Sequence, residues 1–440
     1  MSVGGDVTLE SIKIALLGLG NVGSGVWQIL QRSGDQIALR AGVPLEIGGI
    51  LVRSVDKPRQ VNPDPSLLTT DAYTLLNDPT MPIVVETIGC PDGSTEPALS
   101  YILHALRAGK NVVTANKEVL AKHAKELSAA LAQGRGGLYF EASVAGGIPI
   151  IKALRESLAA NRVQALMGII NGTTNYMLTK MASEKSSFAS VLAEAQACGY
   201  AEADPTSDVE GHDAAYKLAI LSSLAFGVEI EIDDIYREGI TRITPVDLEY
   251  AQELGMVIKL LAIAKEENGT IEARVHPTMI PASHPLANVS DVFNAVFVQG
   301  DAVGDLMFYG RGAGSLPTGS AVVADCIDAA RSLRSGVRLP LSVPLKRKAL
   351  LPIEDTVSRY YIHTRVIDRP GVLAAIATIF GEADVSIESV IQKGQHRQDP
   401  VSLVFVTHLV KERNVRSALS RIRNLSVVRE ISNVIRVEGE

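Results

Sequence analysis

A single lysine lies in an otherwise apolar stretch of this sequence. Lys217 is the only charged residue between Asp213 and Glu229. Removing a lone ammonium from water is costly, so it needs a partner, and Asp213 precedes it by one helical turn. Glu202 and Asp208 lie just upstream. Carboxylates gathered around a half-buried lysine make a tunable proton donor, whereas the alternative is an ordinary surface ion pair.

A second group of residues suited to chemistry lies near the N-terminus. Gly18, Gly20 and Gly23 form a Gly-x-Gly-x-x-Gly pattern between an apolar segment and a helical one. In that context the glycines allow a tight turn, a close approach to a pyrophosphate and close helix packing, and the helix start favours phosphate. The pattern predicts a dinucleotide site that includes Asn21 and Val22, with a ligand-free glycine turn as the alternative.

The end of the second predicted strand bears on the choice of cofactor. An acidic residue there would bind the ribose hydroxyls of NAD, but the strand ends at Arg53, with Lys57 and Arg59 close behind. Because guanidinium groups bind phosphates well, the sequence favours NADP, and NAD is still possible. A surface arginine without a ligand is the alternative. Thr87, at the end of the third predicted strand, is a further cofactor-binding candidate.

Composition limits the class of protein. The chain has 440 residues, of which 46% are hydrophobic and 21% charged, enough for roughly three globular domains. A net charge of -7 without a basic stripe argues against nucleic acid and anionic membranes as partners. The three cysteines and eight histidines show no disulfide framework or transition-metal spacing, which predicts a cytoplasmic protein. We expect neither a signal peptide nor a membrane span.

The first part of the chain has the pattern of a nucleotide-binding fold. Apolar strands alternate with helices over residues 1–147, which predicts a parallel sheet of βαβ units and a Rossmann-type α/β domain. The expected strands are 11–17, 45–52, 82–88, 111–114 and 137–141, and the expected helices include 24–31, 98–108 and 117–132.

A different pattern predicts an α+β domain over residues 148–307. The apolar segment 247–264 is interpreted as one long helix. A helix is also expected at 319–334, and a proline-containing linker at 336–356. Further strands are expected at 163–170, 272–280, 292–298 and 307–314, and further helices at 174–181, 188–198 and 212–226.

Residues 357–440 form a self-contained unit in the prediction. Strands and helices alternate there in the order βαββαβ, which is the ferredoxin-like motif. Asp368 is the predicted N-cap, and Pro370 a predicted first-turn residue, of the helix that starts near Gly371. The strands are 360–366, 385–392, 402–409 and 427–437, and the helices are 371–382 and 411–423.

Taken together, these segments resemble the homoserine dehydrogenase family with a C-terminal ACT domain. The matching stretches occur in family order over most of residues 12–335, and the ACT pattern covers about 357–440. Any one stretch would be a weak signal, but the combination is specific. The stretches are Gly18–Gly23, Val113–Lys117, Glu141–Pro149, Asn171–Tyr176, Gly199–Pro205, Asp208–Lys217 and Gly310–Gly314.

The resemblance implies reversible, NAD(P)H-dependent reduction of L-aspartate 4-semialdehyde to L-homoserine, a step of threonine and methionine biosynthesis. An ammonium group suits this reaction because it can stabilise the developing oxyanion and give it a proton. Lys217 matches the family's acid–base lysine, and Lys117 matches a second active-site lysine near nicotinamide and substrate. From the residues alone, Lys117 would be a solvated lysine in a first helical turn.

The remaining substrate-site residues are also carried over from the resemblance. Asp208 and Asp213 match carboxylates that hold the substrate and Lys217, and Glu202 matches the residue that binds the substrate's amino group. Without the family, Asp213 could be an exposed helix cap and Asn171–Gly172 merely a turn. Pocket positions of the family are matched by Gly172, Thr173 and Tyr200.

Two glycine-containing loops complete the implied ligand sites. Glu141, Val144, Gly146 and Ile148 match a monovalent-cation loop whose oxygens, mostly backbone carbonyls, would bind sodium. A plain strand-to-helix connection is the alternative. Gly314 resembles a glycine that contacts the cofactor, which would bring residues 308–335 back to the nucleotide-binding domain.

The C-terminal module resembles amino-acid-sensing ACT domains, which pair edge to edge and bind an amino acid at the interface. The turn formed by Asp368, Pro370 and Gly371 is the expected ligand position, and threonine is the expected inhibitor. The resemblance implies a homo-oligomer, either a dimer or a tetramer. A dimerising module without a ligand is the alternative.

Two other classes of function compete with this interpretation. An acylating semialdehyde dehydrogenase would need a nucleophilic cysteine, for which Cys90 is the candidate. A non-catalytic amino-acid sensor could retain the nucleotide fold, but the presence of Lys117, Glu202 and Lys217 argues against it.

Overall fold

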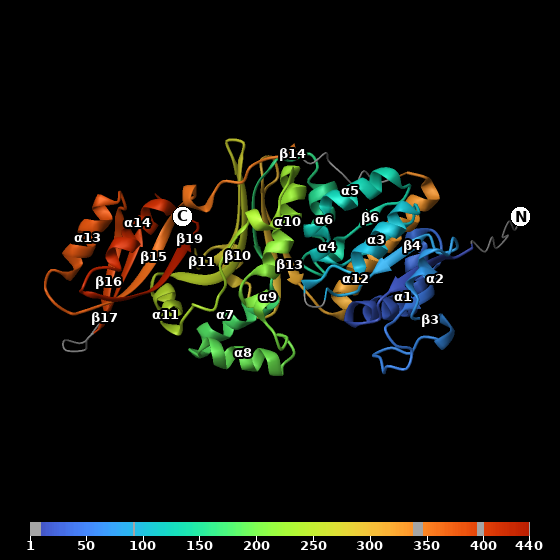
Figure 1. The fold of residues 1–440 in the computed structure, drawn as a ribbon, viewed down its shortest axis with the longest axis horizontal. Helices are drawn as coiled ribbons and strands as arrows, with labels where there is room; N and C mark the ends of the chain where they lie inside the picture. Colours follow the sequence, from blue (N-terminus) through green and yellow to red (C-terminus); the bar gives the residue numbers. More distant parts are fainter. Residues whose placement is uncertain (1–9, 91–92, 338–345, 394–399, 440) are drawn as a thin grey trace, which may run out of the picture. The chain divides into compact units, whose positions relative to one another are not determined.

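The computed structural model describes residues 10–90, 93–337, 346–393 and 400–439. The chain forms two compact units (Figure 1). The first unit comprises Met1–Arg162, Ala219–Ile232 and Phe308–Arg347, and the second comprises Val163–Leu218, Asp233–Met307 and Lys348–Glu440. Among the described residues, no helix is both long enough and apolar enough to cross a membrane.

The first unit is built on a parallel sheet. Its strands lie in the order β3-β2-β1-β4-β5-β6, and every neighbouring pair is parallel. The order reverses between β1 and β4, as in a doubly wound Rossmann-type domain, which confirms the predicted fold class. The strands are β1 (Ile12–Leu17), β2 (Leu45–Leu51), β3 (Leu68–Thr69), β4 (Ile83–Glu86), β5 (Asn111–Thr114) and β6 (Leu138–Tyr139).

A helix from late in the chain packs against the first helix of this unit. Buried Val322 and Cys326 of α12 belong to the same apolar core as Ile14, Leu16 and Val26. The helices cross so closely that a Cβ at residue 25 would lie 2.0 Å from the Ser315 carbonyl oxygen. Helices of this unit are α1 (Asn21–Ala41), α2 (Ala72–Leu76), α3 (Ala98–Arg107), α4 (Lys117–Lys122), α5 (Ala124–Gln133), α6 (Ile150–Lys152) and α12 (Ser315–Ser335).

The helix predicted at 117–132 is two helices in the structure. His123, at φ -123° and ψ 27°, leaves the helical region between α4 and α5. Two short strands of this unit, β8 (Val228–Glu229) and β14 (Lys346–Arg347), pair in parallel.

The second unit is dominated by one large sheet. In the described residues its strand order is β13-β12-β7-β10-β11-β19-β15-β17-β16, with β9 paired to β11 and β18 to β15. The strands are β7 (Val163–Ile169), β9 (Tyr236–Arg237), β10 (Met256–Glu267), β11 (Thr270–Pro281), β12 (Phe293–Gly300), β13 (Gly304–Arg311), β15 (Val357–Val366), β16 (Ile387–Lys393), β17 (Val401–Thr407), β18 (Val410–Lys411) and β19 (Val428–Val437). The helices are α7 (Gly172–Glu184), α8 (Phe188–Ala197), α9 (Thr206–Val209), α11 (Pro245–Glu253), α13 (Val372–Glu382) and α14 (Glu412–Ile422). Helix α10 (His212–Phe226) begins in this unit, and its residues from Ala219 on belong to the first unit.

The long helix predicted at 247–264 is wrong. The structure has the short helix α11, a left-handed Gly255 at φ 70°, and then β10. β10 pairs with β11 along its whole length, from Met256↔Pro281 to Glu267↔Thr270. A strand covered on both faces is a continuous apolar run, so periodicity alone cannot distinguish it from a buried helix.

The C-terminal segment has the predicted βαββαβ order, and its strands lie in the order β19-β15-β17-β16. Two local expectations are wrong, because Asp368 is not the N-cap of α13 and Pro370 precedes the cap and does not lie in the first turn. The cap residue is Gly371, at φ 89°, without a side-chain hydrogen bond. An N-cap directly precedes the first helical residue, here Val372, and Asp368 lies too early; its carboxylate instead accepts a 3.5 Å hydrogen bond from Gln392.

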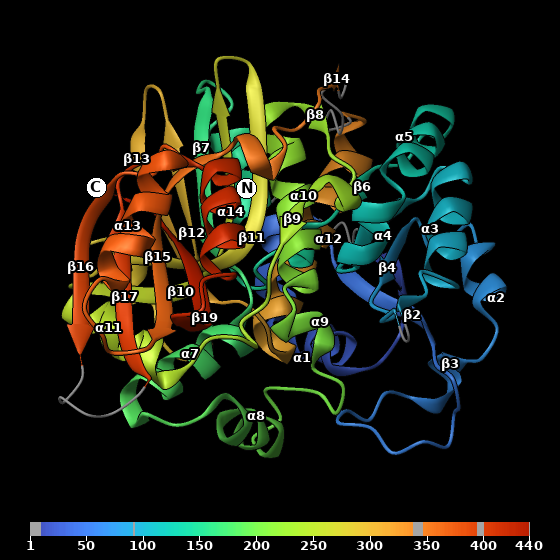
Figure 2. The same ribbon diagram turned by 60° about the vertical axis from the view of Figure 1, so that its left-hand side comes forward.

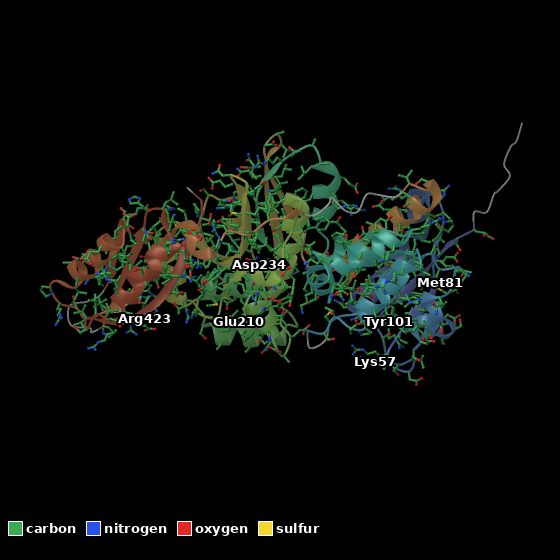
Figure 3. All side chains as sticks on the ribbon, turned by 45° about the horizontal axis from the view of Figure 1, so that its top comes forward. Lys57, Met81, Tyr101, Glu210, Asp234 and Arg423 are labelled. Atoms are coloured by element: carbon green, nitrogen blue, oxygen red, sulfur yellow. The ribbon has the colours of Figure 1, made fainter. Side chains whose placement is uncertain are left out.

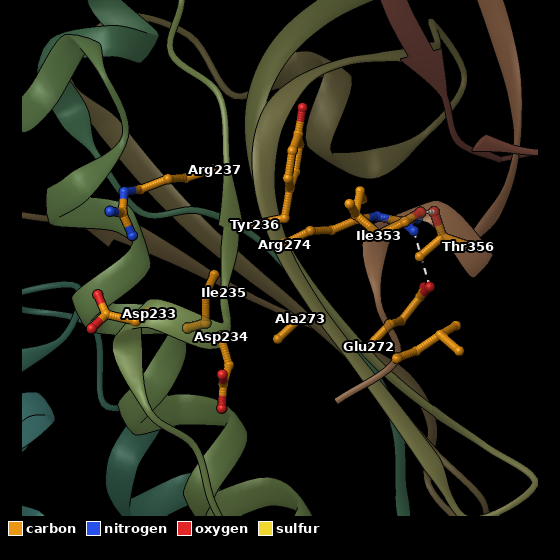
Figure 4. A pocket seen from close by; sticks show the side chains of 11 residues that line it. Asp233, Asp234, Ile235, Tyr236, Arg237, Glu272, Ala273, Arg274, Ile353 and Thr356 are labelled. Atoms are coloured by element: carbon orange, nitrogen blue, oxygen red, sulfur yellow. Dashed lines mark hydrogen bonds and ion pairs between the residues drawn. The ribbon is translucent and has the colours of Figure 1, made fainter. Parts of the chain in front are cut away.

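This C-terminal segment continues the sheet of the second unit. β19 pairs in parallel with β11 at Thr278↔Arg436 and Met279↔Val437, and Figures 1 and 2 show the two strands side by side. A cavity of about 460 Å³ opens beside β11 (Figure 4). Arg274, which is 1% exposed, lines this cavity and forms a 2.9 Å ion pair with Glu272. The residues lining it include no site residue predicted from the sequence.

Candidate active site

The lysine singled out in the sequence is largely buried in the second unit. The Lys217 ammonium donates to the Asp213 carboxylate at 2.7 Å and to the Ile170 carbonyl oxygen at 2.8 Å. The side chains of Lys217 and Asp213 are only 12% and 9% exposed. The ion pair expected from the i, i+4 spacing is therefore present, and its burial excludes an ordinary surface pair.

Local sequence explains why this charge is held in place. Gly211, at φ 79°, turns the chain just before α10, so that Asp213 lies in the first turn and Lys217 one turn later. The following residues Leu218 and Leu221 are 1% and 2% exposed and anchor the helix in the core. The ammonium is thus fixed by packing of its helix as well as by its two hydrogen-bonding partners.

Asp208 adds a second carboxylate to this cluster from the one-turn helix α9. Burial raises the pKa of Asp208, and the neighbouring charge of Asp213 raises it further. An amide hydrogen bond from Asn171, at 2.7 Å, opposes this effect. A half-buried carboxylate beside a paired ammonium is an arrangement suited to proton transfer or to binding a polar substrate.

Sequence reasoning missed the side chain of Asn171. The same amide nitrogen donates to Asp213 at 2.8 Å, so Asn171 bridges the two carboxylates. The available signal was an Asn three residues before the helix predicted at 174–181. In the structure α7 starts earlier, and Asn171 is its N-cap, accepting from the Thr174 amide at 2.9 Å.

The other residues predicted to bind the substrate are Gly172, Thr173, Tyr200 and Glu202, and they also belong to the second unit. The Thr173 hydroxyl donates to the Tyr200 carbonyl oxygen at 2.7 Å, and the Tyr200 ring lies 4.9 Å from the Tyr176 ring. Gly172 packs tightly, since a Cβ there would lie 2.9 Å from the Val292 carbonyl oxygen. The Glu202 side chain is exposed. The structure therefore brings Thr173 and Tyr200 together and leaves the Glu202 carboxylate at the surface.

The glycine pattern of the first unit forms a tight turn from β1 into α1. Gly18 has φ 101°, and a Cβ at residue 23 would lie 2.1 Å from the Gly18 carbonyl oxygen. A Cβ at residue 20 would have no atom within 4 Å, so that side of the turn is open. The Thr87 hydroxyl holds the turn by donating to the Gly18 carbonyl oxygen at 3.0 Å. Because α1 starts at Asn21, its first amides follow directly, as a pyrophosphate site requires.

The basic residues after β2 differ in their surroundings. Arg53 and Lys57 are exposed, and Figure 3 labels Lys57. The Arg59 guanidinium instead donates to the carbonyl oxygens of Val55, at 2.8 Å, and Ser54. Arg59 therefore stabilises its own loop, which leaves Arg53 and Lys57 as the cations suited to a 2′-phosphate.

Lys117 is the first residue of α4 and is only partly exposed. Its ammonium forms a 3.2 Å ion pair with Glu118, and its side chain is 26% exposed. The preceding Asn116 caps the helix by accepting from the Val119 amide, and it also accepts from the Cys90 thiol at 3.1 Å. Burial raises the pKa of Cys90, which keeps the thiol protonated and disfavours a nucleophilic role.

The loop of the predicted cation site packs beside the turn that contains Gly314. The Gly147 amide donates to the Arg311 carbonyl oxygen at 3.1 Å, and Gly314 has φ 123° at the start of α12. The buried Glu141 carboxylate accepts from the amides of Ile151 and Lys152, both at 2.8 Å. This carboxylate therefore caps α6, and the oxygens that this loop can offer a cation are backbone carbonyls, which suit sodium.

The backbone of this loop departs from regular secondary structure. Ala145 and Gly146 are consecutive left-handed residues, at φ 55° and φ 52°, which turns the carbonyls near Val144 and Gly146 away from a regular helix. The Ile148 carbonyl oxygen accepts from the Ile150 amide at 2.9 Å. Over the described residues there is no group of three or more His, Cys, Asp or Glu side chains suited to a transition metal.

Comparison with known proteins gives consistent matches along the chain. Family models described as homoserine dehydrogenase, as its NAD binding domain and as ACT domain match residues 149–327, 18–141 and 360–427. Homoserine dehydrogenase from Corynebacterium glutamicum is 46% identical over 436 residues, covering 98% of this chain and 96% of that protein.

Solved structures agree with these matches. The crystal structure of a homoserine dehydrogenase from Thiobacillus denitrificans has a TM-score of 0.91 and 44% identity, and the match covers 98% of this chain and 99% of that chain. A hyperthermophilic archaeal homoserine dehydrogenase in complex with NADPH has a TM-score of 0.62 and 26% identity, over 74% of this chain and 98% of that chain.

Proposed function

The chain belongs to the homoserine dehydrogenase family of oxidoreductases. We propose that it interconverts L-aspartate 4-semialdehyde and L-homoserine through the residues described above. The observation that carries the proposal is the buried Lys217 ammonium, held by Asp213 and the Ile170 carbonyl oxygen. An ammonium has three N–H groups, and these two contacts use two of them. The third can donate to the oxygen of the substrate.

Lys217 would act as the acid in the direction of reduction. A reduced nicotinamide, when bound, supplies a hydride to the aldehyde carbon. As negative charge develops on the aldehyde oxygen, Lys217 stabilises it and gives it a proton. In the reverse direction Lys217 takes the proton from the hydroxyl group of homoserine, and Asp213 keeps the lysine oriented.

The other site residues would bind the substrate and support the lysine. Glu202 and Asp208 offer carboxylates to the substrate's ammonium group, and Lys117 is the second active-site lysine. The pocket is completed by Gly172, Thr173 and Tyr200. The exposure of Glu202 is consistent with binding a polar ligand, because an exposed carboxylate is accessible to it.

We propose NADP as the preferred cofactor, with NAD also accepted. The pyrophosphate would be bound by the turn formed by Gly18, Gly20, Asn21, Val22 and Gly23. Supporting positions are Thr87, Gly314 and Lys117. Exposed Arg53 supports the preference for NADP, because a guanidinium is a suitable partner for a 2′-phosphate.

Oxygens of Glu141, Val144, Gly146 and Ile148, mostly backbone carbonyls, would bind a monovalent cation, with sodium as the first candidate. The cation would stabilise the loop that packs beside Arg311. The test is to compare activity in sodium, potassium and a bulky organic cation at constant ionic strength.

The C-terminal ACT domain is consistent with feedback regulation. We propose that threonine binds at the turn of Asp368, Pro370 and Gly371 and inhibits a homo-oligomeric enzyme, a dimer or a tetramer. The three free cysteines, Cys90, Cys198 and Cys326, are consistent with a cytoplasmic location.

The decisive experiment is steady-state oxidation of homoserine, followed by the absorbance of the reduced nicotinamide. Activity should require homoserine, and kcat/KM should be higher with NADP than with NAD. Threonine should inhibit. Absence of homoserine-dependent reduction of either cofactor would contradict the proposed reaction, and equal kcat/KM values for the two cofactors would contradict the NADP preference alone.

A further inference from the structure

The side chain of Asn171 has a fixed orientation in the Lys217 cluster. It is 5% exposed, and its oxygen accepts from the amide and the hydroxyl of Thr174, both at 2.9 Å. A backbone amide can only donate, so the Asn171 oxygen must face Thr174. The NH₂ group must therefore face the opposite side, where the carboxylates of Asp208 and Asp213 lie.

The amide group meets both carboxylates at short distances. It donates to an Asp208 oxygen at 2.7 Å and to an Asp213 oxygen at 2.8 Å, and that same Asp213 oxygen accepts from Lys217. Asp213 is buried and Asp208 half-buried, and two carboxylates so close together repel each other, so each needs donors. A neutral amide supplies one N–H to each without adding a positive charge that would compete with Lys217.

The residue before it contributes to the same cluster through its backbone. The Ile170 carbonyl oxygen accepts from Lys217 at 2.8 Å. β7 ends at Ile169 and α7 begins at Gly172, so residues 170 and 171 form the short connection between two regular elements. This connection therefore sets the position of the ammonium and of both carboxylates together.

We propose that Asn171 is a positioning residue for the reaction, which holds Asp213 against Lys217 and Asp208 in place for the substrate. The inference rests on the proposed function, because it assigns Asn171 to the same lysine. Asn171 does not itself exchange a proton; it acts through the two carboxylates. The Asn171 oxygen also caps α7, but this capping is independent of the contacts with the carboxylates, and Ser, Thr or Asp can cap a helix as well.

Two substitutions separate these two tasks. Asn171→Asp keeps an oxygen for the Thr174 amide but replaces the donor by an acceptor beside two carboxylates. Asn171→Ser keeps a capping hydroxyl and removes the bridge without adding charge. Asn175→Ala is the matched control, because Asn175 is a buried asparagine of the same helix whose amide donates to the carbonyl oxygens of Val289, Asp291 and Phe293.

Expected results follow from the contacts. Asn171→Asp should lower kcat for homoserine oxidation about 100-fold, with the KM for NADP unchanged, because the reacting groups are misplaced while the cofactor site is intact. Loss of the hydrogen bond to charged Asp208 raises its pKa, so the acid limb of the pH profile should move up by about one pH unit. Asn171→Ser should show the same shift with a smaller loss of kcat. Asn175→Ala should lower thermal stability and leave the acid limb in place.

A second readout does not depend on turnover. Titration of the Asp208 carboxyl carbon by NMR in the full-length protein should give a higher pKa in Asn171→Ser than in the wild type. An unchanged titration, or a kcat of Asn171→Asp within threefold of wild type, would overturn the positioning role. A wild-type protein that does not oxidise homoserine would overturn the proposed function instead, and the titration would still decide whether Asn171 holds Asp208.

Discussion

At the level of single residues, the Lys217 ammonium is held by the hydrogen-bonding partners that the fold provides for it. Folding removes most of the water around this ammonium, and the Asp213 carboxylate at 2.7 Å and the Ile170 carbonyl oxygen at 2.8 Å take the place of that water as hydrogen-bond partners. A carboxylate that both neutralises and orients the lysine gives a proton donor with one defined direction. Asp208 differs, since burial and the charge of Asp213 raise its pKa.

Replacement of Lys217 by methionine should abolish most catalysis. Lys217→Met preserves the length of the side chain and removes the proton donor, so kcat should fall about 100- to 10,000-fold, the range for general acid–base catalysis. Binding of NADPH, measured by fluorescence titration, should be unchanged. Lys180→Ala is the control, because Lys180 forms ion pairs with Glu184 and Glu194 and lies over the Tyr176 ring, rather than pairing with a carboxylate of the Lys217 cluster. A kcat of Lys217→Met within tenfold of wild type would contradict the assignment.

In the turn between β1 and α1, Gly20 and Gly23 are needed for different reasons. At residue 23 a Cβ would collide with the Gly18 carbonyl oxygen at 2.1 Å, whereas at residue 20 it would meet no atom within 4 Å. Gly23 is therefore required for the turn itself. Gly20 is required only when a ligand approaches the backbone.

Two alanine substitutions should separate folding from cofactor binding. Gly23→Ala should lower the melting temperature and weaken NADPH binding together. Gly20→Ala should keep the melting temperature of the ligand-free protein and weaken NADPH binding about tenfold or more, because the added methyl group occupies the side from which the pyrophosphate approaches. Calorimetry with and without NADPH measures both effects. Tight NADPH binding by Gly20→Ala would contradict this location of the pyrophosphate.

The parallel sheet of the first unit also contains a buried acid at the end of β4. Burial raises the pKa of Glu86 from 4.5 to about 7, although it accepts hydrogen bonds from Thr114 and the Ile88 amide. Asp325 of α12 is similar, because burial raises its pKa from 3.8 to about 7. Both groups hold a proton more tightly in the folded than in the unfolded protein.

These raised pKa values fix the sign of a pH effect on stability. Well below pH 3.8 both carboxyl groups are protonated in the folded and the unfolded state, and as the pH rises to about 7 the unfolded state loses these protons first. The free energy of unfolding should therefore fall over this interval, by up to about 3 kcal/mol for Glu86. Glu86→Gln should flatten the curve measured by urea denaturation, whereas exposed Glu46→Gln should not. A slope that is the same in Glu86→Gln and the wild type would contradict the prediction.

On the scale of the whole molecule, one buried carboxylate joins the C-terminal module to the rest of the second unit. Asp247 of α11 is 0% exposed and accepts from Tyr361, His363 and Asn433 at 3.1, 3.3 and 2.9 Å. Burial alone would raise the pKa of Asp247, but hydrogen bonds from His363, Asn433 and Thr244 outweigh it and lower the pKa. Together with the β11–β19 pairing, this contact makes the module part of one sheet.

Removal of this carboxylate should loosen the module. Asp247→Ala leaves the donors of Tyr361, His363, Asn433 and Thr244 without this acceptor, which should lower the free energy of unfolding by about 3 kcal/mol or more. A protease in limited amount should then cleave the segment between α11 and the C-terminal strands faster in Asp247→Ala than in the wild type. The control is Asp234→Asn, because Asp234 is exposed beside the cavity in Figure 4. Equal stability of Asp247→Ala and wild type would contradict this role.

The sequence by itself determined the features that depend on local pattern. The spacing of Asp213 and Lys217 is a helical one, the glycines follow a strand, and the βαββαβ order comes from periodicity and turn residues. Each signal lies within a few residues, where backbone geometry dictates which side chains meet. The same locality explains the wrong helix at 247–264, because a strand covered on both faces has no alternation to reveal it.

Only the tertiary structure decided what depends on contacts between distant segments. Asn171 meets Asp208 and Asp213 because β7, α9 and α10 converge, and no spacing in the sequence indicates that contact. The packing of α12 on α1 and the pairing of β19 with β11 likewise join segments that are far apart in the chain. Where these segments converge, they exclude water from the side chains of Asp208 and Lys217. This loss of water raises the pKa of Asp208 and leaves Lys217 largely buried.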